Sequence, residues 1–180
     1  MKISNANKVS LFAMLAFAVL LTSSCKKLDN LVKVNLELQM AQVPFTIDTS
    51  AAGTTTNTGT VHFDVDSAIK SNNASFGVGN IKTATIDSVV ITLTGATFTG
   101  VTNTGASFYS DAVSTPITIA ANATGSTSSS LTLSPSTTVD LTSYLKATSF
   151  TYTFTSTHPQ VLAPIPANAA VYFHLLVEPN

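Results

Sequence analysis

The sequence predicts an all-β protein: an antiparallel β-sandwich of about eight strands with one or two short helical turns. Val, Ile, Leu and Phe repeatedly alternate with Thr, which is typical of strands that bury one face. Short stretches rich in Gly, Ser, Thr and Pro separate these alternations, which favours a sandwich. The sequence leaves open whether the topology is immunoglobulin-like or a jelly roll.

Residues 1–24 have the composition of a secretory signal peptide. Lys2 and Lys8 precede an apolar run over residues 9–21, which is the order of the positive and hydrophobic regions of such signals. The run, about 13 residues, is shorter than the roughly 20 residues that a permanent transmembrane helix needs. We therefore expect the segment to be removed and the mature chain to begin at Cys25.

The residues around Cys25, Leu-Leu-Thr-Ser-Ser-Cys-Lys-Lys, resemble the lipobox of bacterial lipoproteins of the Bacteroidetes type. The resemblance covers residues 1–27 and implies that the Cys25 thiol takes a diacylglycerol group and the new amine an acyl chain. Several acyl chains anchor a protein stably. We expect a protein of the outer membrane, facing the periplasm or the cell exterior. In this interpretation residues 25–30 are a short tether and residues 31–180 form one domain.

The alternative to lipidation is a secreted protein that is cleaved nearby and keeps Cys25 as a free thiol. Cys25 is the single cysteine of the chain, so no disulfide can form within it. Lipidation accounts for this lone thiol, and we therefore favour it.

The charge balance argues against nucleic acid as a partner. Charged residues make up 9% of the sequence, and all eight basic residues are Lys. Without Lys2 and Lys8, six Lys stand against nine acidic residues, a net charge of −3. Nucleic-acid binding normally needs a basic surface, often with Arg.

The first half of the mature sequence contains the cleanest alternation, over residues 31–40. Pro44 precedes a short second alternation and is expected at a sheet edge or a bulge. Residues 49–60 are interpreted as a polar loop. A strand follows at residues 61–65, and Asp66 is expected to cap one or two helical turns.

The second half contains the most apolar mature stretch, residues 86–93. Val89, Ile91 and Leu93 are expected on one face and Ile86 and Val90 on the other, which predicts a central strand. Weaker alternations at 98–119 and 131–133 give short strands, and regular ones follow at 150–154 and 171–177. The segment 139–146 repeats the Asp-capped pattern of 65–70, which we attribute to two crossovers between sheets rather than to duplication. The predicted shared core comprises Leu36, Leu38, Val89, Ile91, Phe173 and Leu175.

No residue pattern indicates catalysis, a metal or a cofactor. His62, His158 and His174 lack the spacing of a metal site and are interpreted as surface residues. Asp64 and Asp66 would lie about 6.6 Å apart on one strand face, but a helix cap explains Asp66 better than a glycosidase pair does. No G-x-S-x-G elbow is present. We expect a protein that is not an enzyme, without catalytic residues, metal ligands or cofactors.

Two short segments resemble the Asp-Ser/Thr-apolar acceptor for O-glycosylation of exported Bacteroidetes proteins: Asp66-Ser67-Ala68 and Asp87-Ser88-Val89. The resemblance implies a glycan at Ser67 and, less readily, at Ser88. A sugar on Ser88 would clash with a neighbouring strand unless Ser88 lies on a bulge or outside the sheet edge. The alternative is that Asp66 and Asp87 are a helix cap and a turn residue, with neither Ser modified.

These features predict a lipid-anchored domain of the cell envelope that is structural, adhesive or part of a complex, with the membrane, envelope proteins or glycans as partners. One alternative is a glycan-binding accessory module, although Trp is absent and the four Tyr are scattered. Another is a pilus-type subunit that exchanges a strand. A pocket with convergent polar groups and an exposed aromatic favours the glycan module, whereas a contiguous apolar patch favours the first interpretation.

Overall fold

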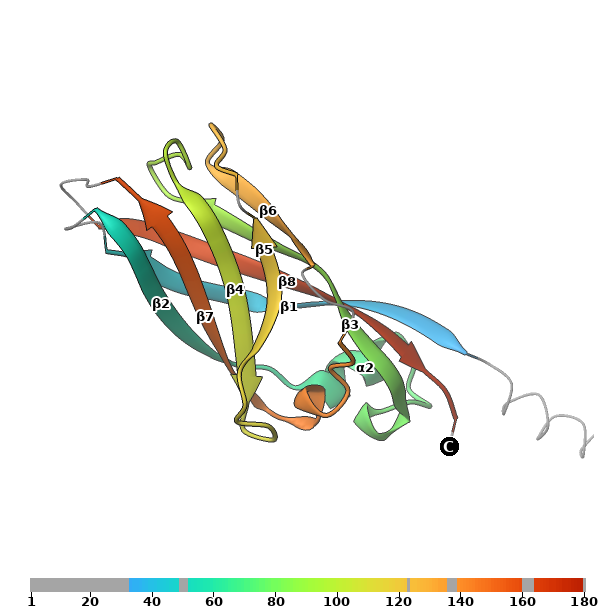
Figure 1. Ribbon diagram of the computed structural model, residues 1–180. Coiled ribbons are helices and arrows are strands. Elements are labelled where there is room, and N and C mark those ends of the chain that lie inside the picture. The colour runs from blue at the N-terminus through green and yellow to red at the C-terminus, as the bar shows by residue number, and fades with distance from the viewer. Residues whose placement is uncertain (1–32, 49–51, 123, 136–138, 160–163, 180) are drawn as a thin grey trace, which may run out of the picture.

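Two four-stranded antiparallel sheets pack face to face in the computed structural model, which describes residues 33–48, 52–122, 124–135, 139–159 and 164–179 (Figure 1). The first sheet has the order β1-β8-β3-β6 and the second the order β2-β7-β4-β5. Two residue pairs between β5 and β6 join them along one side. This strand order is that of a jelly roll. It confirms the predicted sandwich and decides between the two topologies.

The described residues form eight strands, one α-helix and two short 3₁₀ turns. No helix in these ranges has the length and apolar character needed to cross a membrane. The elements are β1 (Val34–Ile47), β2 (Gly53–His62), α2 (Val65–Asn72), η2 (Val78–Asn80), β3 (Ile81–Leu93), β4 (Thr102–Ser110), β5 (Ile117–Asn122), β6 (Ser130–Pro135), η3 (Tyr144–Lys146), β7 (Ser149–His158) and β8 (Ile165–Val177).

The inner faces of both sheets form one hydrophobic core, and the six residues predicted to share it are all buried. The ring of Phe108 on β4 lies 6.0 Å from that of Phe173 on β8, a contact that connects the two layers, and 5.6 Å from that of Tyr152 in its own sheet. The buried Tyr152 hydroxyl donates to the Met40 sulfur at 2.8 Å. Burial raises the pKa of the Tyr152 phenol, so this group stays neutral and apolar contacts dominate the core.

Strand β1 is an edge strand with one bulge, as expected from Pro44. Met40 pairs with Val171 and Val43 with Ala169 on β8, so two residues of β1 lie opposite the single residue Ala170. Such an insertion shifts the side-chain alternation by one position. Leu36, Leu38 and Met40 before the bulge and Val43, Phe45 and Ile47 after it therefore all face the core.

Strand β3 lies between β8 and β6, which confirms its interior position. The prediction that Ile86 lies on the face opposite Val89 is wrong. The register shifts between Ile86 and Ser88, and this bulge puts both Ile86 and Val89 into the core. Val90, in contrast, is half-buried on the outer face.

Two further expectations are wrong. Residues 53–60, assigned to a polar loop, belong to β2, because Thr is a good strand former even where few apolar residues accompany it. The cap of helix α2 is Asp64 and not Asp66: the Asp64 carboxylate accepts from the Ser67 backbone N–H at 2.9 Å. Asp66 lies within the first turn, so the two aspartates do not share a strand face. The crossover interpretation holds, since α2 and η3 each connect strands of different sheets.

Candidate functional site

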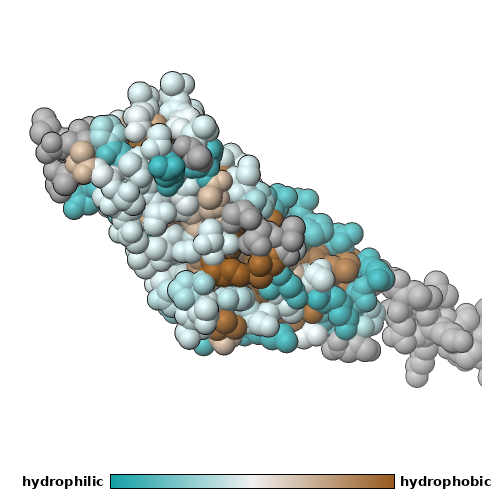
Figure 2. Space-filling model, viewed as in Figure 1, coloured by the Kyte–Doolittle hydropathy of each residue, from teal (hydrophilic) through white to brown (hydrophobic). Residues whose placement is uncertain are grey.

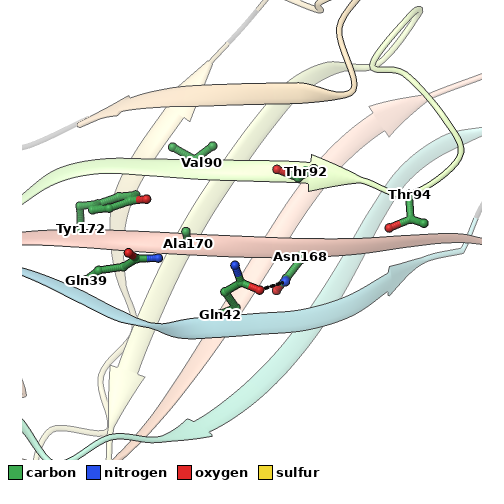
Figure 3. Close-up of a pocket in the computed structure, with 8 residues that line it drawn as sticks. All are labelled: Gln39, Gln42, Val90, Thr92, Thr94, Asn168, Ala170 and Tyr172. Atoms are coloured by element: carbon green, nitrogen blue, oxygen red, sulfur yellow. Dashed lines mark hydrogen bonds between the residues drawn. The ribbon is translucent and has the colours of Figure 1, made fainter.

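A groove of about 330 Å³ lies on the outer face of the first sheet, across β1, β8 and β3 (Figure 3). None of its lining residues is charged, and most carry an amide or a hydroxyl. The lining residues are Gln39, Gln42, Val90, Thr92, Thr94, Asn168, Ala170 and Tyr172.

The bulge in β1 builds one wall of the groove. Gln39 and Gln42 are three residues apart, a spacing that puts side chains on opposite faces of a regular strand. The extra residue between Met40 and Val43 brings both amides to the outer face, where both are exposed. The small side chain of Ala170, opposite the bulge, leaves the floor open.

Strands β3 and β8 supply the other wall and the two ends. Thr92 pairs with Asn168 and Val90 with Ala170, so their side chains stand side by side on the outer face. Tyr172 lies at one end of the groove with its hydroxyl directed along the strand toward Ala170 (Figure 3). Its ring is half-buried and leaves an aromatic surface accessible from the groove.

Asn168 has an unpaired acceptor. Its side-chain N–H donates to Gln42 Oε1 at 2.5 Å, while its own Oδ1 is buried and has no hydrogen-bond partner among the described residues. A buried polar atom without a partner costs about 1–3 kcal/mol. Such atoms are uncommon in folded proteins and call for an explanation. Because this atom is buried, a ligand in the groove would contact the rest of the Asn168 side chain and not its Oδ1.

The predicted modification sites have different surroundings. Cys25 lies outside the described residues. Ser67 is exposed in the first turn of α2, and its hydroxyl donates to Asp64 Oδ2 at 2.6 Å. Ser88 is half-buried at the β3 bulge, where it pairs with Tyr172. The bulge is the geometry under which Ser88 was expected to accept a sugar.

Two acids with a lowered pKa, Asp64 and Asp66, lie at the N-terminus of α2. Hydrogen bonds from the Ser67 side chain and backbone lower the pKa of Asp64. The Lys70 ammonium, followed by the Val78 backbone N–H, lowers the pKa of Asp66. In the turn before η3, burial opposes ionisation of Asp140, but hydrogen bonds from Thr142 and Ala84 outweigh it and lower the pKa of this group. These carboxylates accept hydrogen bonds that hold nearby backbone segments in place, and this structural role explains their lowered pKa values.

The histidines do not converge. His62 is exposed and His174 half-buried, but His158 is buried, so its assignment to the surface is wrong. His158 lies within hydrogen-bond distance of the Pro159 carbonyl (2.9 Å) and the Thr55 hydroxyl (3.2 Å), and the inward phase of β7 places it there. Within the described ranges, no three His, Cys, Asp or Glu side chains come together as a metal site would require.

Comparison with known proteins gives no family. No family model and no curated protein matches the sequence. Similar solved structures include the VP2 subviral particle of infectious bursal disease virus, at 10% identity over 83% of this chain and 34% of that chain, with a TM-score of 0.42. Turnip yellow mosaic virus is 9% identical over 83% of this chain and 82% of that one, with a TM-score of 0.29. The chain spans about a third of the VP2 particle's chain. These distant likenesses carry no functional conclusion.

The groove residues escape detection in the sequence because they come from three strands that only the topology brings together. Gln39 and Gln42 belong to one strand, but their shared face depends on the bulge. The change in phase between Leu38-Met40 and Val43-Phe45 is the sequence signal that indicates it.

Proposed function

We propose that this protein is a lipid-anchored, non-catalytic module of the cell envelope that binds a neutral glycan in the groove across β1, β8 and β3. The observation that carries the proposal is the uncharged groove that combines the amide side chains of Gln39, Gln42 and Asn168 with the half-buried ring of Tyr172. The proposal takes the glycan-binding alternative rather than a purely structural role.

The chemistry of the lining fits a sugar. Hydroxyl groups of a glycan donate to amide oxygens and accept from amide N–H groups, and the groove offers both through Gln39, Gln42 and Asn168. The apolar face of a sugar ring can pack on the aromatic surface of Tyr172. Because no lining residue is charged, we propose a neutral ligand rather than a uronic acid or a phosphorylated sugar. The volume lies at the lower end of the ~300–1,000 Å³ typical of ligand sites.

The rest of the described surface supports binding through polar groups more than through an apolar patch. Among the described residues, Val139 is the one large hydrophobic side chain that is clearly exposed, at 40%. The outer face of β2, β7 and β4 is largely pale in Figure 2, as expected for Ser and Thr side chains, and the brown residues in this view gather in smaller areas to the right of it and below it.

Calorimetric titration with neutral hexasaccharides of glucose, xylose and mannose tests the groove, with an oligogalacturonate as the charged comparison. Tyr172→Ala and Asn168→Ala should each weaken binding of the best neutral oligosaccharide about tenfold or more, since each tenfold step corresponds to about 1.4 kcal/mol. Tyr109→Ala is the matched control, because Tyr109 is half-buried on the outer face of the second sheet. Equal losses for Tyr109→Ala and Tyr172→Ala, or preference for the charged oligosaccharide, would contradict the proposal.

The anchor is a separate part of the proposal and rests on the residues before Cys25. Cys25→Ala should abolish incorporation of a fatty-acid analogue and leave the protein soluble or unprocessed, because the thiol carries the proposed lipid. Label retained by the variant, or a mature N-terminus at another residue, would contradict it.

O-glycosylation of Ser67 also remains a proposal, and the exposure of this side chain supports it. A glycan on Ser67 would replace the hydroxyl proton that bonds Asp64 Oδ2, while the backbone bond to Asp64 Oδ1 would persist. The intact mass of protein from its native host, compared with that of Ser67→Ala, tests this. A mass shift unchanged in the variant would place the modification elsewhere.

A further inference from the structure

We propose that β2 pairs antiparallel with β2 of a second copy, so that the second sheet continues across a two-fold axis. β2 is the last strand of its sheet and bonds β7 on one side. The other side presents the N–H and C=O groups of alternate residues of β2, and no strand among the described residues pairs with them. Such an edge is a template for a further strand.

The two edge strands of the molecule differ in how they are protected. β1 contains Glu37, Pro44 and the bulge, and the ion pair between Lys33 and Glu178 (2.7 Å) lies at its beginning. Charges, Pro and bulges all discourage the addition of a strand. β2 has no Asp, Glu, Lys or Pro, and its register with β7 is regular over ten consecutive pairs. The chain thus protects one edge and leaves the other open.

The outward side chains of β2 are self-complementary. They are Thr54, Thr56, Thr58 and Thr60, placed symmetrically about Asn57 and all exposed. An antiparallel pair centred on Asn57 brings Thr56 of one copy opposite Thr58 of the other, and Thr54 opposite Thr60. The same type of pair already exists inside the molecule, where the hydroxyls of Thr54 and Thr157 lie 3.0 Å apart and those of Thr60 and Thr151 3.1 Å apart. Cross-strand Thr pairs stabilise antiparallel sheets.

The direction of β2 determines how the two copies point. β1 and β2 run in opposite directions, so β2 runs back toward the end of the sandwich where β1 begins (Figure 1). An antiparallel pair therefore places the beginnings of the two β1 strands at opposite ends of the dimer. With the lipid anchor proposed above, the pair would join two facing membranes; this consequence rests on the anchor, whereas the pairing itself does not.

Analytical ultracentrifugation of the chain from Lys26 onward, which contains every strand, tests the pairing. The protein should show a concentration-dependent monomer–dimer equilibrium. The double variant Thr56→Lys/Thr58→Lys should be monomeric, because it places like charges opposite each other, and so should Thr56→Glu/Thr58→Glu. A mixture of the two should form a heterodimer. Thermal melts establish that each variant is folded.

Thr153→Lys is the matched control, since Thr153 lies on the same outer face but one strand in from the edge, opposite Thr58. This variant should dimerise like the original protein. A protein that stays monomeric at every concentration would overturn the proposal. So would a dimer that persists in the Lys double variant, or charge variants that do not associate when mixed.

Discussion

The outer faces of the two sheets show what a β-bulge changes. On β2 and β7, ten pairs run in regular register, and the outward Thr side chains of one strand lie opposite those of the other. On β1, β8 and β3, register shifts at Met40/Val43 and Ile86/Ser88 interrupt the alternation. The interrupted face gathers Gln39, Gln42 and Tyr172 around a groove. Regularity thus favours pairing with another strand, and irregularity favours a binding site.

Deleting one residue from each face should give the largest difference in stability between the regular strands and the bulged ones. Deletion of Thr153 from regular β7 puts the following residues on the wrong face and exposes Phe154. We expect at least about 5 kcal/mol of destabilisation, because each buried aromatic lost costs ~3–5 kcal/mol. Deletion of Gln42 instead leaves one residue between Met40 and Val43, so both keep their partners and their inward orientation.

Circular dichroism melts and oligosaccharide titration provide the measurement. The chain lacking Gln42 should still melt cooperatively but bind its oligosaccharide more weakly, while the chain lacking Thr153 should not fold. If both deletions unfold the protein, the bulge is not the independent insertion that the register indicates.

A charged side chain placed in the shared core should destabilise the fold, whichever sheet carries it. Ile91→Asp buries an unpaired carboxylate at a side chain that is 1% exposed, and we expect a loss of about 4–5 kcal/mol or more. Lys33→Asp removes an exposed ion pair with Glu178 and should cost at most about 1 kcal/mol. Similar melting temperatures for the two variants would mean that the faces of β1 or β3 are misassigned.

A smaller effect is expected where β2 meets β1 across the sandwich. A Cβ at Gly59 would lie 2.6 Å from Val43 Cγ1 and 3.1 Å from the Pro44 carbonyl oxygen. Gly59→Ala should therefore destabilise the fold by about 1–3 kcal/mol through overpacking. Gly79→Ala is the control, because nothing lies within 4 Å of its added Cβ. Urea unfolding of both variants measures the difference, and equal midpoints would show that β1 and β2 do not pack closely there.

The sequence predicts the sandwich and its core well because burial enforces period-two alternation in strands such as β7 and β8. It fails at β2, where Thr55, Asn57 and Gly59 occupy the inward positions and leave Val61 as the strand's buried apolar residue. It also misplaces the cap, since Asp64 and Asp66 both precede the helical pattern and the choice depends on where Val65 turns into α2. The groove depends on strand order, which local patterns do not encode.

The smallest effect concerns helix α2, which connects regular β2 to bulged β3. Hydrogen bonds from Ser67 lower the pKa of Asp64 in the folded protein. A carboxyl whose pKa is lower in the folded than in the unfolded chain stabilises the fold above its unfolded value of about 3.9, and this contribution is lost as the pH falls through the folded pKa. Asp64→Asn keeps a side chain that caps helices well but cannot ionise.

We expect Asp64→Asn to lower the melting temperature slightly at pH 7. The melting temperature of this variant should also depend less on pH between pH 5 and pH 3, an interval that contains the unfolded pKa of about 3.9. Ser67→Ala removes the hydroxyl donor at 2.6 Å but leaves the backbone donor at 2.9 Å, so its pH dependence should lie between those of Asp64→Asn and the original protein. Melting curves at pH 7, 5, 4 and 3 measure this pH dependence for each variant. If Asp64→Asn loses as much stability on acidification as the original protein, the cap carries no part of the acid sensitivity, and Asp66 and Asp140 become the groups to substitute next.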